Sequence, residues 1–121
     1  MTDINGTIDT YLAMLNELDA DKRAALVATV FTPDAEWVDP PLESAGHAGI
    51  SDMVGTIYQH YPAHSFRRTS AVDAHHDVVR FTWELVGPDG AVAFAGLDVA
   101  HLADDDRLRR VTGFIGELAA A

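Results

Sequence analysis

The spacing of hydrophobic residues changes character about halfway along the chain. Up to residue 61, apolar side chains recur every three or four positions, which is the period of an amphipathic helix. The pattern predicts helices over residues 4–18, 21–30 and 46–61. The residues expected to cap or end these helices are Thr2 or Asp3, Asp19 or Asp21, and Pro62.

Beyond residue 62 the sequence is typical of β-strands. Four segments rich in Val, Phe, Thr, Trp and Leu alternate with the turn sequences HH, GPDG and DDD. Such short connections make neighbouring strands antiparallel. Helices followed by strands predict an α+β domain with the helices on one face of a sheet. The predicted strands are residues 66–74, 77–86, 91–102 and 108–118, with an earlier short strand, 35–38, that the Pro40-Pro41 pair ends.

The GPDG turn predicts which side chains share a face of the sheet. We place Gly87 and Gly90 at its two ends, and directly opposed residues then project to the same side. One face carries an acid, Asp98, among apolar side chains, where a charged carboxylate is costly to bury. The predicted pairs are Val79–Asp98, Phe81–Gly96 and Trp83–Phe94, and the opposite face holds Arg80, Thr82, Glu84, Leu97, Val99 and His101.

A second acid lies beside a tryptophan in the segment AEWVDPP. Side chains alternate along a strand, so Trp37 and Asp39 point to one side and Glu36 and Val38 to the other. Because Trp37 is large and apolar, its side should face the core. Asp39 and Asp98, from different strands, are therefore both expected inside the domain.

Each acid has a functional and a structural interpretation. A carboxylate beside an apolar wall can exchange protons near neutral pH when burial tunes its pKa. Alternatively, Asp39 is a polar residue at a strand end, hydrogen-bonded to a turn. Asp98 could equally be a buried acid satisfied by the backbone or by an arginine such as Arg109 or Arg110.

The order of elements, together with three phrases, resembles the nuclear transport factor 2-like superfamily, and within it the SnoaL-like and ketosteroid isomerase-like proteins. The phrases are FTPDAEWVDP, AGHAGI and GLDVAHLADDDRLRRVTGF. The resemblance covers nearly the whole chain and implies one domain, residues 1–121. It implies a cone-shaped, curved mixed or antiparallel sheet that three helices close over an apolar pocket, and a homodimer formed through the outer sheet face.

The resemblance also implies roles for the two acids. Asp39 matches the general base of ketosteroid isomerase, and Asp98 matches the acid that stays protonated and donates a hydrogen bond to the developing oxyanion. The isomerases add a tyrosine donor from the first helix. That position falls at Leu15 or Met14 here, and Tyr11 lies about one turn away, so the sequence departs from the isomerase pattern.

We therefore predict a cofactor-free enzyme that moves a proton next to a carbonyl group of a small hydrophobic molecule, as an isomerase or polyketide cyclase does. Two alternatives stay open. An epoxide hydrolase of this superfamily would need an arginine, for which Arg80 is the candidate, between the acids. A ligand carrier or dimerisation protein would keep the fold without the chemistry. The residues expected to contact substrate are Tyr11, Met14, Trp37, Val54, Tyr58, Phe81, Trp83 and Phe94, with His47 as a secondary acid or base.

Composition narrows the classes of partner. A net charge of −11 opposes nucleic-acid binding, which depends on neutralising phosphates. The apolar runs are shorter than the roughly 20 residues of a membrane span. The chain has no cysteine and an acidic, polar N-terminus, which fits a cytoplasmic protein. Pro62 separates His60 from His64, and His75-His76 is expected to lie in an exposed turn. We therefore expect no metal site.

Overall fold

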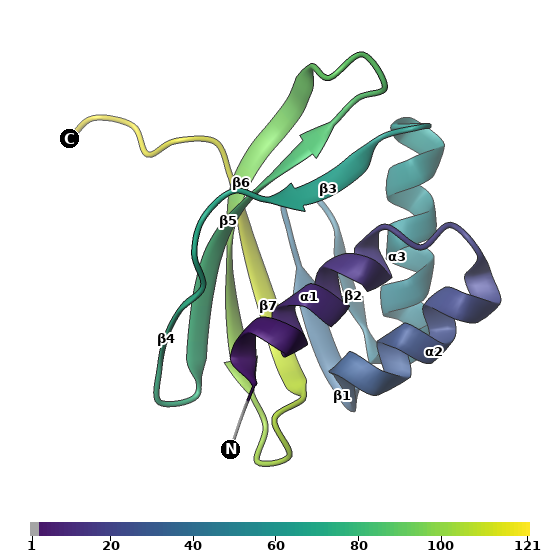
Figure 1. The fold of residues 1–121 in the computed structure, drawn as a ribbon, viewed down its shortest axis with the longest axis vertical. Coiled ribbons are helices and arrows are strands. Elements are labelled where there is room, and N and C mark those ends of the chain that lie inside the picture. The colour runs from purple at the N-terminus through teal and green to yellow at the C-terminus, as the bar shows by residue number, and fades with distance from the viewer. Residues whose placement is uncertain (1–2) are drawn as a thin grey trace.

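Three helices pack against one face of a curved, open sheet (Figure 1). This computed structural model describes residues 3–121. The helices are α1 (Ile4–Leu15), α2 (Ala20–Val30) and α3 (Gly46–His60). The strands are β1 (Phe31–Val38), β2 (Glu43–Ala45), β3 (Ser65–Arg68), β4 (Asp73–His75), β5 (Val78–Val86), β6 (Val92–Leu102) and β7 (Leu108–Ile115). The predicted fold class, an α+β cone with a curved sheet, is confirmed.

The sheet is mixed. Its strand order is β2-β1-β7-β6-β5-β3, and β4 pairs with β5 beyond the end of β3. The pairing of β1 with β7 is parallel, and the other strand pairs are antiparallel. The parallel pair brings the end of the first strand beside the last strand, so segments more than 70 residues apart in sequence become neighbours.

The first helix is shorter than its apolar pattern predicts. It ends at Leu15, whereas the three-residue spacing continues to Leu18, which is 68% exposed. The reason is Asn16, which caps the helix and uses its side-chain amide to bond both the N–H and the C=O of Phe66 in β3. Asp3 and Asp19 cap α1 and α2 as predicted, and the alternative cap Thr2 lies outside the described residues.

The predicted strand at 66–74 is wrong as one element. The chain forms β3 and β4 separately, with a break between them where the Ser70 hydroxyl accepts a hydrogen bond from the Thr82 N–H of β5. The first strand is longer than expected and begins at Phe31. It tolerates Pro33 because its pairing with β7 is interrupted between Phe31 and Glu36. The three-residue strand β2 has no alternating pattern and was not predicted.

The β5–β6 hairpin has the predicted faces but not the predicted pairs. Phe81, not Val79, lies opposite Asp98. One extra residue sits in the turn, where the Gly87 N–H bonds the Ala91 carbonyl, and Ala93 has no partner in the ladder. The extra turn residue and the unpaired Ala93 together shift the register by two residues. Because side chains alternate sides with a period of two, every residue keeps its predicted side.

The core lies between the helices and the inner face of the sheet. Trp37 and Phe81 are buried there as predicted, and Tyr11 packs edge-on against Phe31 and Phe81. On the inner face of the sheet the core includes a buried acid, Asp98 of β6.

Candidate functional site

Four strands bring Asp39 and Asp98 into one row on the inner face of the sheet. Asp98 in β6 lies opposite Phe81 on one side and Gly113 of β7 on the other. Val38, at the end of β1, is the parallel partner of Thr112, so Asp39 follows beside Gly113. The alternation in AEWVDPP and in the β5–β6 hairpin correctly predicts that both acids face inward.

Gly113 provides the space in which the two carboxylates meet. A Cβ atom at this position would overlap Asp39 Oδ1 and would lie 3.0 Å from Asp98 Oδ1. Both acids therefore border the space that a side chain on Gly113 would occupy. We call Asp39 and Asp98 the acid pair.

Asp98 is held by two hydrogen-bond donors from different elements. The Trp83 indole Nε1–H donates to Asp98 Oδ1 at 3.0 Å, and the Tyr11 hydroxyl donates to Oδ2 at 2.9 Å. Trp83 can reach the acid because Gly96, its cross-strand partner, has no side chain, and a Cβ there would overlap the indole ring. Asp98 is only 3% exposed.

The two arginines considered as partners of Asp98 lie elsewhere. Arg109 pairs with Asp77, and Arg110 pairs with Glu36, in both cases among exposed side chains. The buried acid is therefore satisfied by a phenol and an indole, and no cation among residues 3–121 pairs with it.

Asp39 is less buried than Asp98 and is less well satisfied. Its backbone N–H bonds the Leu42 carbonyl across the turn that leads to β2, a turn that contains a cis Pro40–Pro41 peptide. Its side-chain atom Oδ1, however, is buried without a hydrogen-bond partner among residues 3–121. A carboxylate oxygen left in this way favours the protonated form of the group.

The electrostatic environment raises the proton affinity of both acids. Burial, and then the charge of Asp98, raise the pKa of Asp39 to about 7. Burial raises the pKa of Asp98 to about 6, while the hydrogen bonds from Tyr11 and Trp83 oppose the shift. Burial and the nearby acids raise the pKa of Tyr11 well above its usual value, so its hydroxyl stays protonated and remains a donor.

An apolar cavity of about 190 Å³ opens beside Asp39. Asp39 is the one charged residue in its lining within the described part of the chain. We call this space the Asp39 cavity. Its lining residues are Asp39, Pro40, Pro41, Leu42, Ile57, Tyr61, Phe66, Trp83, Leu85, Phe94 and Ile115.

The predicted substrate-contacting residues divide into three groups. Trp83 and Phe94 line the Asp39 cavity. Tyr58 is half-buried and donates its hydroxyl to the Leu15 carbonyl. The remaining five are buried in the core and do not line the cavity, namely Tyr11, Met14, Trp37, Val54 and Phe81.

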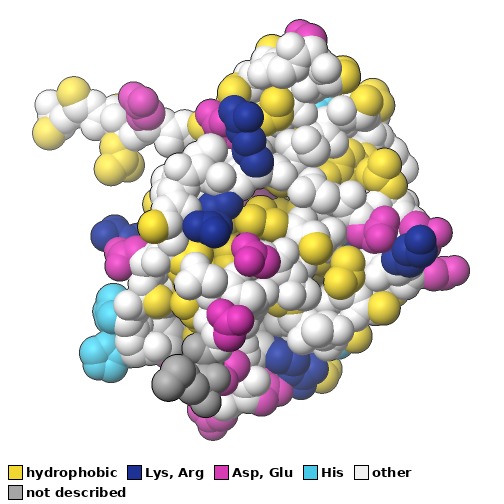
Figure 2. Space-filling view, viewed as in Figure 1, with side chains coloured by type: hydrophobic (Ala, Val, Ile, Leu, Met, Phe, Trp, Pro, Cys, Tyr) yellow, Lys and Arg dark blue, Asp and Glu magenta, His cyan; other side chains and the backbone are white. Residues whose placement is uncertain are grey.

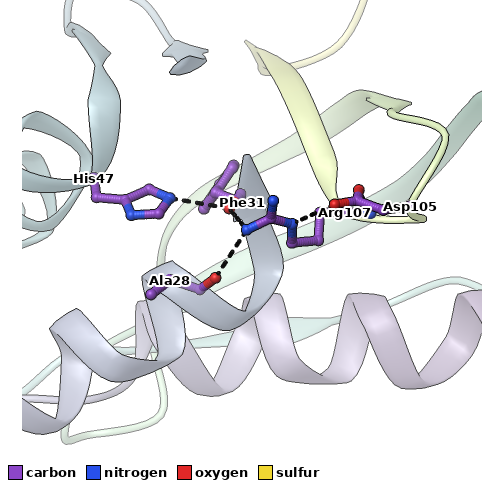
Figure 3. A network of polar contacts seen from close by, with 5 residues as sticks. All are labelled: Ala28, Phe31, His47, Asp105 and Arg107. Atoms are coloured by element: carbon purple, nitrogen blue, oxygen red, sulfur yellow. Dashed lines mark hydrogen bonds and ion pairs between the residues drawn. The ribbon is translucent and has the colours of Figure 1, made fainter. Parts of the chain in front are cut away.

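His47 and Arg80 lie away from the acid pair. The His47 Nε2 contacts the Phe31 carbonyl at 2.9 Å, in a network that Arg107 extends to the Ala28 carbonyl and to Asp105 (Figure 3). This network ties the junction of α2 and β1 to the start of α3 and the β6–β7 turn. Arg80 projects from the outer face, as its parity predicts, and pairs with Asp73. It does not bridge the acids as an epoxide hydrolase would require.

A larger depression, of about 410 Å³, lies between the start of α1 and the turn before β7. Most of its lining residues have polar side chains, Thr7, Thr10 and Arg107 among them, and they include neither acid of the pair. We therefore place the candidate site in the smaller cavity, which combines an apolar wall with an acid of raised pKa.

Among residues 3–121, Asp39 and Asp98 are the acids whose pKa is raised, so the other surface depressions lack this combination. Acidic side chains are spread over the face shown in Figure 2, with fewer basic ones between them. Residues 3–121 contain no group of three or more His, Cys, Asp or Glu arranged to hold a metal ion. No helix of the described chain is long and apolar enough to cross a membrane.

The sequence did not predict most of the residues that line the Asp39 cavity. Leu85 alternates with Trp83 along β5 and could have been found by the same parity argument. Ile57 and Tyr61 belong to the predicted apolar stripe of α3, where nothing distinguishes a cavity-facing residue from a core residue. Gly113 gives no signal in one sequence, because its importance depends on the parallel pairing of β1 with β7.

The profile of the SnoaL-like domain family matches residues 8–111. The chain belongs to the SnoaL-like family. A solved structure of a proposed isomerase of this family from Agrobacterium tumefaciens is 33% identical, and the match covers 97% of this chain and 100% of that one with a TM-score of 0.90. No curated protein matches the chain.

More distant structures share the fold of this SnoaL-like chain. An NTF2-like protein of unknown function from an Exiguobacterium species is 18% identical over 93% of this chain and 99% of that one, with a TM-score of 0.72. A proposed polyketide cyclase from Sinorhizobium meliloti is 16% identical over 93% and 94% of the two chains, with a TM-score of 0.71. At these identities the likeness shows the architecture alone.

Proposed function

We propose that the protein catalyses proton transfer next to the carbonyl group of a small, neutral, apolar molecule, with Asp39 as the base. The observation that carries this proposal is a half-buried carboxyl group with an unpartnered oxygen, facing an apolar cavity, with a pKa of about 7. A base that titrates near the working pH combines a populated ionised form with a high proton affinity. Similarity to a proposed isomerase supports the same reaction class.

The size of the Asp39 cavity restricts the substrate. Its volume is about 190 Å³. An apolar cavity of roughly 150 Å³ accommodates benzene. A single-ring or short-chain ketone fits this space, and a four-ring steroid does not. With no Lys, Arg or His in the lining of the described chain, anionic substrates have no counter-charge there.

The reaction also requires a donor for the oxyanion that forms when the proton leaves. Asp98 was predicted for this role, but it does not line the cavity, and both its oxygens accept hydrogen bonds. Among the lining residues of the described chain, Tyr61 has the one hydroxyl. We assign the oxyanion contact to Tyr61, and Y61F should lower the rate while Asp39 continues to titrate as in the wild type.

The test uses the β,γ-unsaturated isomer of cyclohexenone. Asp39 would take the proton between the carbonyl and the double bond, a dienolate would form, and the same proton would return to the γ carbon to give the conjugated enone. The conjugated product is followed by its ultraviolet absorbance. We expect the rate to rise with pH through about 7, as Asp39 ionises, and D39N to lower it by a factor of about 100 to 10,000.

Two controls make this test decisive. D34N changes an exposed acid on the same strand and should leave the rate unchanged. Binding of the ketone without turnover, at equal strength in D39N and wild type, would replace the catalytic proposal with a carrier function. Equal turnover by D39N and wild type would show that Asp39 is not the base.

The outer face of the sheet carries apolar side chains that favour an interface with a second copy of this chain. Leu97 and Phe114 are cross-strand neighbours there, and Phe114 is 55% exposed. Val99 lies two residues further along β6 on the same side. We propose that this apolar strip forms a homodimer interface, which leaves the Asp39 cavity on the opposite side of the sheet accessible.

A further inference from the structure

We propose that Tyr11 and Trp83 hold Asp98 as an anion, and that this anion acts as a positioning residue that makes Asp39 the protonated member of the acid pair near neutral pH. The inference extends the proposed function. Only its predicted effect on the reaction rate rests on that function. Its physical basis is an asymmetry between two neighbouring carboxyl groups, which cannot both ionise without repulsion.

The asymmetry begins with hydrogen bonding. Asp98 receives one donor on each oxygen, Trp83 Nε1–H on Oδ1 and the Tyr11 hydroxyl on Oδ2. An indole N–H can only donate, and the Tyr11 phenol remains protonated in this buried position. Two donors on one carboxyl group stabilise its ionised form.

Asp39 has the opposite environment. Its Oδ1 is buried without a partner among residues 3–121, and its nearest charged neighbour is Asp98, across the space above Gly113. Both burial and the negative charge of Asp98 favour a proton on Asp39. When the pair carries one proton, that proton therefore resides on Asp39, the member that faces the cavity.

The cations closest in the sheet do not neutralise Asp98. Arg80 and Arg110 project from the outer face toward exposed acids, and Arg109 pairs with the exposed Asp77. Arg68 of β3 bonds the Ser70 carbonyl and lies 3.9 Å from Asp9 of α1. Among residues 3–121, the titratable group that shifts the pKa of Asp39 is Asp98, and the one that shifts the pKa of Asp98 is Tyr11.

The consequence is a stronger base. An anion beside Asp39 disfavours loss of its proton, so Asp39 binds the proton it removes from the substrate more firmly until the proton is returned. In this role Asp98 acts through Asp39 and does not touch the substrate. The role also accounts for a buried charge that no cation among residues 3–121 compensates.

The experiment measures the titration of each carboxyl carbon by NMR in the wild type, D98N, Y11F and Y58F. In the wild type we expect Asp98 to titrate below Asp39. In D98N the pKa of Asp39 should fall by on the order of one unit, because one neighbouring charge is removed. In Y11F the pKa of Asp98 should rise, because one donor is lost, without a change in the cavity lining.

Y58F is the matched control. It also removes one phenol hydroxyl, but that hydroxyl donates to the Leu15 carbonyl and to the Asn16 side-chain oxygen and not to an acid, so both titrations should stay as in the wild type. An unchanged Asp39 titration in D98N, or Asp98 titrating above Asp39 in the wild type, would overturn the inference. Y11F provides an independent result if D98N does not fold.

The same variants separate this inference from the proposed function. With the cyclohexenone probe, D98N should move the midpoint of the pH–rate curve down by the same shift that NMR records. Failure of the wild type to isomerise the probe would refute the proposed function, while the NMR titrations would still decide the role of Asp98. Turnover in D98N with an unshifted midpoint would overturn the inference and leave the proposed function standing.

Discussion

At the scale of single residues, the site depends on two glycines as much as on its acids. Gly113 leaves room for the Asp39 carboxyl group, and Gly96 leaves room for the Trp83 indole that bonds Asp98. Each glycine lies on the inner face of the sheet, where a larger side chain would otherwise add to the core. Because neither glycine has a side chain, the Asp39 carboxyl group and the Trp83 indole occupy space that apolar side chains would otherwise fill.

G113A tests the space between the acids. The added methyl group would overlap Asp39 Oδ1, so we expect the carboxyl group to move and isomerisation of the probe to fall at least tenfold. The overpacking should lower the free energy of unfolding by about 1 to 3 kcal/mol. G49A in α3 is the control, because a Cβ there would lie at an ordinary contact distance of 3.7 Å from Ser44 of β2, and it should be neutral or stabilising. Full activity in G113A would contradict the assigned geometry.

D39N tests the link between proton binding and stability. Because the pKa of Asp39 rises from 3.8 to about 7 on folding, the folded protein binds more protons than the unfolded chain between these values, and stability falls as pH rises through this range. D39N should raise the free energy of unfolding by up to about 4 kcal/mol near pH 8 and have little effect near pH 4. Denaturant titrations at both pH values check this, and D34N should show no such difference.

At the scale of elements, the cavity wall depends on how α1 is joined to β3. Asn16 ends the helix and bonds both backbone groups of Phe66, which lines the Asp39 cavity and packs edge-on against Trp83. One side chain thus replaces a neighbouring strand along the edge of β3. This connection fixes the distance between the helical layer and the sheet at the site.

N16A should loosen this edge. Loss of the Asn16 side-chain amide leaves the N–H and C=O of Phe66 without their protein partner. We therefore expect the free energy of unfolding to fall by about 1 to 2 kcal/mol. Amide hydrogen exchange at Phe66 should accelerate by more than the global loss of stability explains. N5A, at an exposed position in α1, is the control and should not change exchange at Phe66. Unchanged protection in N16A would contradict this role.

At the scale of the whole molecule, the two faces of the sheet have different roles. Its inner face contacts the helices and contains the acid pair. Its outer face carries apolar side chains such as Leu97 and Phe114 between charged ones, and residues 116–121 run away from the domain (Figure 1). An apolar strip on one face of a small domain is typical of an interface.

F114D tests the proposed dimer. Placing a charge opposite Leu97 in the centre of the strip should convert the protein to a monomer, which sedimentation velocity detects directly. L18D is the control, because Leu18 is also exposed but follows α1, away from the sheet. We expect L18D to sediment as the wild type. A monomeric wild type at micromolar concentration would contradict the proposed interface.

The sequence by itself determined the three helices, most of the strands and the inward direction of both acids. Helical and strand periods are local, and alternation fixed the side of Asp39 and of Asp98 even where the β5–β6 register was wrong by two residues. The resemblance in sequence also predicted the family. These features depend on neighbours in sequence, so a single chain reveals them.

Only the tertiary structure decided how the acids meet. The parallel pairing of β1 with β7 joins distant segments, and it brings Asp39, Gly113 and Asp98 into one row. Tyr11 was predicted to contact substrate, and the packing of α1 instead places its hydroxyl on Asp98. Cavity and core use the same residue types, and whether a Trp or Leu lines a space or fills it depends on packing between elements far apart in sequence.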